Sequence, residues 1–212
     1  MEEKNPFSLV QIDVLKEIGN IGAGNAATSM SRLINKKVDM QVPSVKIITF
    51  DEVMELVGGA ETPVAAVMIN IEGEAPGKVY FILTIEEAKS LITSITGQQD
   101  VDLLNNTEQD DLVVSAVKET GNILTGSYIT ALSDFTGLLL KPSVPYLSVD
   151  MAGAVLSAGL IDVSTVTDYA IIIDTQINEG ETENGIKGNF LFLPDPDSCA
   201  RLFHSLGIQN DG

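Results

Sequence analysis

The chain has 212 residues, enough for one large domain or two small ones, and 44% of them are hydrophobic. Its 30 acidic and 12 basic residues give a formal net charge of −18, which disfavours nucleic acid and anionic membranes as partners because their phosphates would be repelled. Its one cysteine excludes an intrachain disulfide, no apolar run approaches the ~20 residues of a membrane helix, and no signal peptide is visible, so we expect a cytoplasmic protein.

The first half of the chain is predicted to hold two strands that form a hairpin, with helices and an extended segment around them. In chain order these elements are a long helix over 9–34, an extended stretch over 37–49, a short helix over 51–57, strands over 64–72 and 77–84, and a helix over 85–96. A polar segment without periodicity, residues 97–110, follows.

The second half predicts the same elements in the same order. They are a long helix over 110–136, an extended stretch over 138–149, a short helix over about 151–160, strands over 169–178 and 187–194, and a helix over 197–206. In the loop between the two strands, the acidic side chains of Glu179, Glu181 and Glu183 are expected to be solvated.

An internal duplication explains this order. Shifting the sequence by 102 residues aligns 12–43 with 114–145 without a gap, and ten of the 32 pairs are identical. We therefore expect a single domain over 1–212 built from two repeats, residues 8–97 and 108–208. Its predicted fold class is α+β, with tandem helix–strand–helix–hairpin–helix repeats around a largely antiparallel sheet in pseudo-twofold arrangement.

The duplicated long helices each carry one polar stripe. Residues spaced i, i+4 and i+7 share a helix face, which places Asp13, Glu17 and Asn20 together, with Gly24 on the same stripe. The stripe recurs in the second half as Ser115, Glu119, Asn122 and Gly126. A glycine inside a helix is destabilising relative to alanine, and its place beside the amide is explained if another backbone approaches there.

The opposite helix faces are predicted to be buried in the core. They carry Leu15, Gly22, Ala26, Ser29 and Leu33 in the first helix and Val117, Leu124, Tyr128, Ala131 and Phe135 in the second. A single Glu-x-x-Asn stripe is ordinarily a solvated face. Here the exposed stripe matches between the repeats while core positions differ, which favours a functional face.

Other candidate sites find little support in the sequence. The run GNIGAGNAA lacks the spacing of a dinucleotide-binding loop and the Lys-Ser/Thr of a phosphate-binding loop. With a single histidine, His204, and a single cysteine, Cys199, neither a zinc site of the usual kind nor a Ser/His/Asp triad is expected. Asp195-Pro196-Asp197 is typical of a helix N-cap rather than of a calcium loop.

The spacing Asp/Ser-x-x-x-Glu-x-x-Asn, with proline 23 residues after the asparagine, resembles the signature of the CheC, CheX and FliY phosphatases of bacterial chemotaxis. It occurs as Asp13, Glu17, Asn20 and Pro43, and again as Ser115, Glu119, Asn122 and Pro145. The resemblance implies hydrolysis of the phospho-aspartate of the response regulator CheY. It also implies a second partner, the receptor deamidase CheD, near the segment 150–160, for which Asp150 is the candidate contact.

The resemblance also suggests roles for the side chains. Asn20 and Asn122 would orient the attacking water, an amide role known in other phosphoryl transfers. Glu17 and Glu119 would dock the regulator's active site, and Asp13 and Ser115 would support them at the rim. The chain itself is expected to bind no metal or cofactor, because the regulator would bring Mg²⁺. The alternative is a non-enzymatic adaptor that regulates CheD or the flagellar motor switch by binding. A small-molecule enzyme with its site between the halves has little support but stays open.

Overall fold

The structure is a computed structural model that describes residues 8–99, 101–104, 111–157, 169–179 and 185–207. The first half contains helix α1 (Leu9–Ile34), strands β1 (Val38–Gln41) and β2 (Val45–Thr49), helix α2 (Phe50–Leu56), strands β3 (Pro63–Gly73) and β4 (Gly77–Thr84), and helix α3 (Ile85–Thr96). The second contains α4 (Asp111–Thr136), β5 (Leu140–Pro142), β6 (Tyr146–Met151), helical residues 152–157, β7 (Tyr169–Glu179), β8 (Ile186–Pro194) and α6 (Pro196–Ser205).

The predicted element order agrees with this structure, with one refinement in each half. Each extended stretch after a long helix is two strands, β1 and β2 in the first half and β5 and β6 in the second. The short helix expected from about Met151 begins one residue later, since Met151 ends β6, and its expected end at Leu160 lies outside the described residues.

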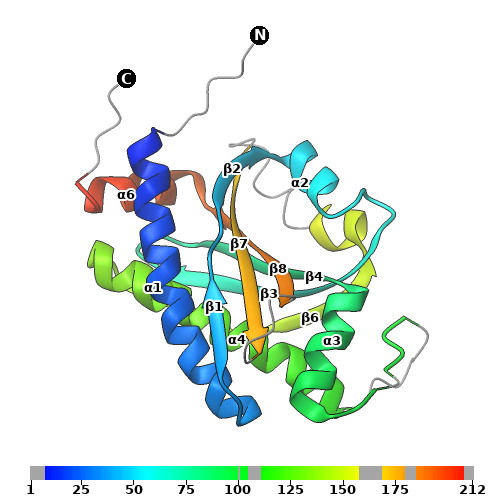
Figure 1. Cartoon of the computed structure of the whole chain (residues 1–212). Helices are drawn as coiled ribbons and strands as arrows, with labels where there is room; N and C mark the ends of the chain where they lie inside the picture. The colour runs from blue at the N-terminus through cyan, green and yellow to red at the C-terminus, as the bar shows by residue number, and fades with distance from the viewer. Residues whose placement is uncertain (1–7, 100, 105–110, 158–168, 180–184, 208–212) are drawn as a thin grey trace.

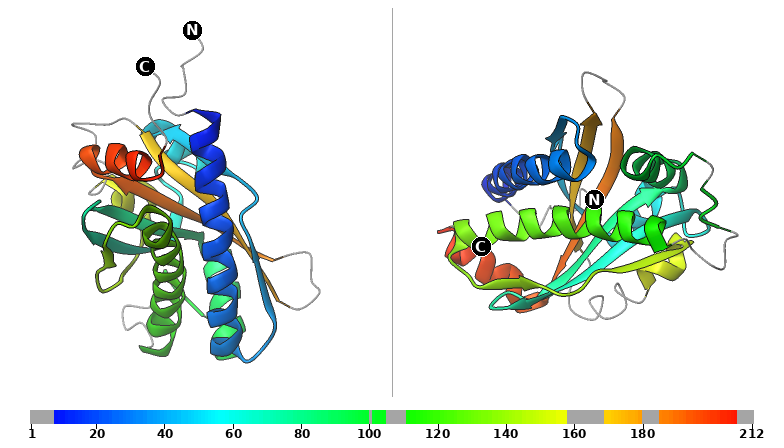
Figure 2. Two further views of the ribbon diagram at one scale, coloured as in Figure 1. Left: turned by 90° about the vertical axis from the view of Figure 1, so that its left-hand side faces the viewer. Right: turned by 90° about the horizontal axis from the view of Figure 1, so that it is seen from below.

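All eight described strands belong to one sheet, and every pairing in it is antiparallel. The hairpins β3–β4 and β7–β8 lie side by side in its centre, joined by β4 and β8. From either edge of the sheet, the short strands that follow a long helix come first, then the first and then the second strand of a hairpin. The predicted α+β class with pseudo-twofold symmetry is therefore confirmed. Figures 1 and 2 show the sheet strongly curled between the helices.

The two repeats exchange their edge strands. β1 and β2, from the first half, pair with β7 of the second half, whereas β5 and β6 pair with β3 of the first half. Each long helix lies beside the same hairpin as the short strands that come after it in the chain, so α1 also lies near β7 and α4 near β3. Every edge of the sheet therefore combines a helix from one repeat with a hairpin from the other.

Side chains alternate between the two faces of the sheet, as expected of a sheet that is covered on both sides. On β3, Ala65, Val67 and Ile69 point into the larger core beneath α1, α3 and α4. Val64 and Ala66 point into the smaller core, which is closed by α2 and the helical residues 152–157. Apolar strand residues on both faces thus fix the sheet as the middle layer.

The small residues predicted in α1 do permit a close approach to another helix. A Cβ atom built on Gly22 would lie 2.4 Å from Cδ1 and 2.9 Å from Cα of Tyr128, so α1 and α4 meet there almost backbone to backbone. Figure 2 shows the two helices lying against each other. The predicted core faces are wrong at their C-terminal ends, because Leu33 is 39% and Phe135 is 50% exposed.

Helix ends are capped as their sequences suggest. Ser8 forms a capping box with Gln11 at the start of α1, and Thr49 does the same with Glu52 at the start of α2. The hydrogen bonds from Thr49 to the Glu52 carboxylate lower the pKa of that exposed side chain. Asp195 occupies the N-cap position before α6, as predicted.

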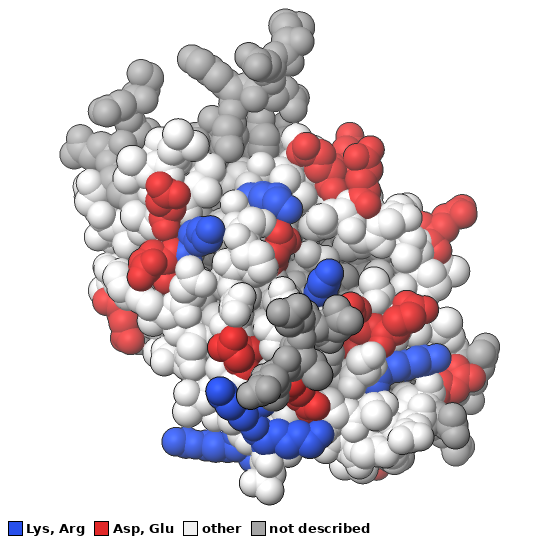
Figure 3. All heavy atoms as spheres, in the orientation of Figure 1, with Lys and Arg blue, Asp and Glu red and all other residues white. Residues whose placement is uncertain are grey.

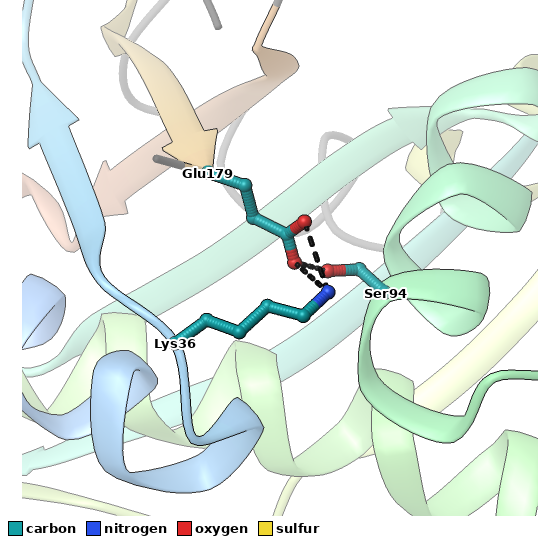
Figure 4. Close-up of polar contacts among 3 residues, drawn as sticks. All are labelled: Lys36, Ser94 and Glu179. Atoms are coloured by element: carbon teal, nitrogen blue, oxygen red, sulfur yellow. Dashed lines mark hydrogen bonds and ion pairs between the residues drawn. The ribbon is translucent and has the colours of Figure 1, made fainter. Parts of the chain in front are cut away.

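Glu179 is not simply solvated, contrary to the sequence-based expectation. Its carboxylate forms an ion pair with Lys36 Nζ at 3.3 Å and accepts a hydrogen bond from Ser94 Oγ. Figure 4 shows these three side chains converging from the connection between α1 and β1, the end of β7 and α3. The contact joins elements of both repeats. Glu181 and Glu183 lie outside the described residues.

Candidate functional site

Both polar stripes face outward. Asp13, Glu17 and Asn20 are exposed on α1, and Ser115, Glu119 and Asn122 are exposed on α4. Their neighbours Ile18, Gly19 and Gly121 are buried against the sheet. Helical periodicity therefore separates the two kinds of residue as the sequence suggests.

The stripe side chains are also chemically available. Among the described residues, none forms a hydrogen bond or an ion pair with the side chains of Glu17, Asn20, Glu119 or Asn122. A carboxylate and a carboxamide that are exposed and without such partners can each accept hydrogen bonds, and the amide can also donate them. Each stripe can therefore contact a visiting macromolecule without breaking an internal contact.

The two motif prolines occupy matching irregularities in the edge strands. Gln41 pairs with Gln176 and Val45 with Ile173, so four steps along the edge strand oppose three steps along β7. The same excess of one residue occurs between Pro142–Ile71 and Tyr146–Met68. Pro43 and Pro145 therefore sit in β-bulges, which are among the few places where a sheet tolerates proline.

The first bulge lies directly beside its stripe. The Val42 methyl groups are 3.6 Å from the position of a Cβ on Gly19, the residue before Asn20. Val42 is buried, whereas the adjacent Pro43 is exposed. The proline loop and the asparagine thus share one stretch of surface, and buried Val42 links them from below.

The two motif helices are seated differently on the sheet. A Cβ on Gly121 would lie 2.6 Å from Val67, so α4 requires glycine there. The nearest atoms to a Cβ on Gly19 are 3.6 Å away, an ordinary contact distance, and Gly19 lines a small apolar cavity together with Tyr128 and Phe190. The duplicated glycine is therefore obligatory in one helix only.

The stripe glycines Gly24 and Gly126 have open space around them. Apart from the helix's own nearby backbone, no atom of the described residues lies within 4 Å of a Cβ built on either glycine. Packing within the chain therefore does not explain them, which leaves room for the approach of an external backbone predicted from the sequence. Ile21, beside Asn20, is an exposed apolar residue on the same helix.

Charge is interspersed rather than gathered into one field on the face shown in Figure 3. Basic side chains gather at its lower edge, where α1 ends and where Arg32, Lys36 and Lys37 are exposed.

In the described part of the chain, no three His, Cys, Asp or Glu side chains are grouped so that they could hold a metal ion. None of the described helices has the length and apolarity to cross a membrane.

Asp150 lies apart from both stripes in sequence, near the end of β6. Its side chain is exposed, its residue pairs with Val64 of β3, and one carboxylate oxygen accepts a hydrogen bond from the Met151 amide. Residues 158–160, the end of the segment expected around it, lie outside the described residues.

Sequence reasoning missed the contacts that hold the first proline bulge. Asp174 of β7 lies opposite the bulge and binds Ser44 and Lys46. No sequence signal links these residues, because about 130 positions separate them and the pairing of β2 with β7 crosses between the repeats.

The fold and the stripes define a class: a duplicated α+β domain that presents two surface carboxylate–carboxamide motifs, the first of them beside a proline bulge. The model of the CheC-like family matches residues 10–47 and 112–149, the two segments that carry these motifs. The chain is 44% identical to the CheY-P phosphatase CheC of Bacillus subtilis over 94% of its own length and 95% of that protein. This chain belongs to the CheC-like family.

Solved structures share the fold at lower identity. FliY of Thermotoga maritima matches with a TM-score of 0.69 and 19% identity, covering 95% of this chain and 98% of that one. The middle domain of FliM from H. pylori matches with a TM-score of 0.66 and 13% identity, covering 94% and 99%. These similarities concern the fold alone.

Proposed function

We propose that this protein is a phosphatase that hydrolyses the phospho-aspartate of a CheY-type response regulator. The observation that carries the proposal is the outward presentation of Glu17–Asn20 and Glu119–Asn122 in a chain 44% identical to a protein named CheY-P phosphatase CheC. The free carboxylates and amides suit a site that is completed by a second protein.

In the proposed mechanism, Asn20 and Asn122 position a water in line with the phosphorus. A carboxamide does not act as a base near neutral pH, but an acyl phosphate is already activated, so orientation and electrostatics suffice. Glu17 and Glu119 dock on a cation in the regulator's active site, and Asp13 and Ser115 support them at the rim. A hundredfold acceleration corresponds to about 2.7 kcal/mol of transition-state stabilisation.

Mg²⁺ belongs to the regulator's side of the proposed complex. The stripes offer one or two acidic side chains each, Asp13 and Glu17 on α1 and Glu119 on α4, too few for a protein site that holds Mg²⁺ by itself. The ion would neutralise charge on the phosphoryl group while this chain supplies the oriented water.

Turnover separates the phosphatase from an adaptor. A regulator phosphorylated with acetyl phosphate and Mg²⁺ is mixed with the protein at a hundredth of its concentration, and loss of the phosphoryl group is followed in time. The phosphatase clears the whole pool faster than spontaneous hydrolysis. An adaptor binds its stoichiometric share and leaves the remainder decaying at the spontaneous rate, and this outcome would refute the proposed activity.

We further propose that CheD binds at the segment that begins with Asp150. The exposure of Asp150 near the end of β6 supports a partner surface there. Asp150→Lys is expected to weaken CheD binding, measured by calorimetry, and to leave regulator turnover unchanged. Unaltered CheD affinity would remove Asp150 from this surface.

A further inference from the structure

The Pro43 bulge is fixed from the opposite strand by a single side chain. Asp174 is one of the two β7 residues between the ladder pairs Gln41–Gln176 and Val45–Ile173, so it faces the extra residue of the edge. Its neighbour Ile173 contacts the position of a Cβ on Gly19 at 3.7 Å. Because side chains alternate along β7, Ile173 points to the core beneath α1, and Asp174 holds the bulge from the opposite face of the sheet.

Asp174 makes three contacts across the bulge. Its backbone amide donates to the Ser44 carbonyl at 3.0 Å, its carboxylate accepts a hydrogen bond from Ser44 Oγ, and the same carboxylate oxygen pairs with Lys46 Nζ at 3.0 Å. The carboxylate side chain is 25% exposed, so the surrounding chain shields the pair in part. One acidic side chain thus holds Ser44 and Lys46, the residues on either side of Val45.

The second bulge is held in another way. The Ser143 amide donates to the Asn70 carbonyl at 2.8 Å, and Ser143 Oγ accepts from the Asn70 amide at 3.0 Å. Among the described residues, the opposite strand contributes only main-chain atoms to this bulge. The side chain from the other repeat thus fixes the first bulge and not the second. Substituting it is therefore expected to affect the first site and to spare the second.

We propose that Asp174, from the second repeat, is a positioning residue for the first site. It holds the Pro43 bulge in one shape against α1, so that the loop beside Glu17 and Asn20 meets the phosphorylated regulator ready-formed. The inference rests on the proposed phosphatase function. Asn20 itself stays on a helix that Asp174 does not contact, so Asp174 acts on partner binding more than on the oriented water.

The test isolates the first site by silencing the second with Asn122→Ala. In that background, Asp174→Ala is expected to raise KM for the phosphorylated regulator roughly fivefold to tenfold while kcat changes less than about twofold, the pattern of lost binding shared by ground and transition states. Asp174→Asn retains an acceptor for Ser44 Oγ but loses the charge that faces Lys46. Its KM is therefore expected to lie between the KM of the Asp174 chain and that of Asp174→Ala.

Three controls keep the inference open to refutation. Ser44→Ala removes the same hydrogen bond from the loop side and is expected to raise KM in the same direction, which covers the case in which Asp174→Ala does not fold. Asp39→Ala changes another acidic residue of the same edge and is expected to leave KM unchanged. In an Asn20→Ala chain, where the second motif alone acts, Asp174→Ala is expected to have no effect.

Two failures are distinguishable. Full turnover by the double variant Asn20→Ala, Asn122→Ala would overturn the proposed function itself. If that variant is inactive, an unchanged first-site KM in both Asp174→Ala and Ser44→Ala overturns the positioning role alone, as does an equal fall in kcat at both sites, which marks a general loss of folded protein.

Discussion

At the scale of single residues, glycines in one helix have opposite structural meanings. Gly22 lies at the crossing of α1 and α4, where a Cβ would meet the backbone of Tyr128 at 2.9 Å. Gly24, two residues later, faces open space. The first glycine is required by the fold, and the second weakens the helix without a packing reason within the chain.

Gly22→Ala is expected to lower the free energy of unfolding by about 1–3 kcal/mol through overpacking at the helix crossing. Gly24→Ala, its matched control, is expected to raise it by about 0.5–1 kcal/mol because alanine favours the helix. Urea unfolding monitored by circular dichroism measures both. If a partner's backbone approaches at Gly24, its alanine variant also loses turnover despite the gain in stability. Equal stability of the two variants would contradict the packing described here.

Cys199 offers a pH-dependent test of burial. Burial raises the pKa of its thiol from 9.0 to about 11, so the reactive thiolate is scarce near neutral pH. At pH 8 we expect alkylation of the folded protein by iodoacetamide to be about a hundredfold slower than that of the urea-unfolded chain, because two pKa units separate them. The rate in the folded state should rise as the pH approaches 11. Equal rates in both states at pH 8 would show an accessible thiol.

At the scale of elements, the two motif helices rest on different supports. α4 lies so close to the sheet at Gly121 that a Cβ built on this residue would overlap Val67. A Cβ built on Gly19 of α1 would instead make ordinary van der Waals contacts, beside a small cavity. Gly121→Ala is therefore expected to destabilise the protein by about 1–3 kcal/mol. Gly19→Ala is expected to be neutral or to add up to about 1 kcal/mol, as in other helix interiors. Thermal unfolding of the two variants measures the difference, and equal losses would contradict it.

The elements themselves were largely predictable from the sequence, because periodicity and turn residues act locally. The long helices, both hairpins and the outward stripes follow from such signals. The bulges at Pro43 and Pro145 did not, since a bulge is defined only against a partner strand. The exposure of Leu33 and Phe135 was missed because periodicity alone does not reveal where along a helix its contacts with other elements end.

At the scale of the whole molecule, the exchange of edge strands was also beyond sequence reasoning. Similar repeats permit two pairings, β1 and β2 on their own hairpin or on that of the other repeat, and the two have the same local patterns. In the structure each helix and bulge is supported by the opposite hairpin, and Asp174 and Ser44 are one such pair. Neither repeat thus pairs its edge strands with its own hairpin.

Because the repeats interlock, the chain is expected to unfold as one unit. Single Trp reporters introduced at the exposed positions Leu33 and Phe135, one in each repeat, should report the same urea midpoint. Far-ultraviolet circular dichroism of the same variants checks that the reporters leave the helices intact. Two separate transitions would contradict the interlocked arrangement and favour independent halves.

The central claim is that the two exposed asparagines orient the water that attacks the regulator's phospho-aspartate. The most direct measurement is the rate of phosphoryl loss from a CheY-type regulator in the presence of the double variant Asn20→Ala, Asn122→Ala, with circular dichroism to show that the variant is folded. The account predicts decay at the spontaneous rate, with activity left in each single variant. Undiminished hydrolysis by the folded double variant would contradict it.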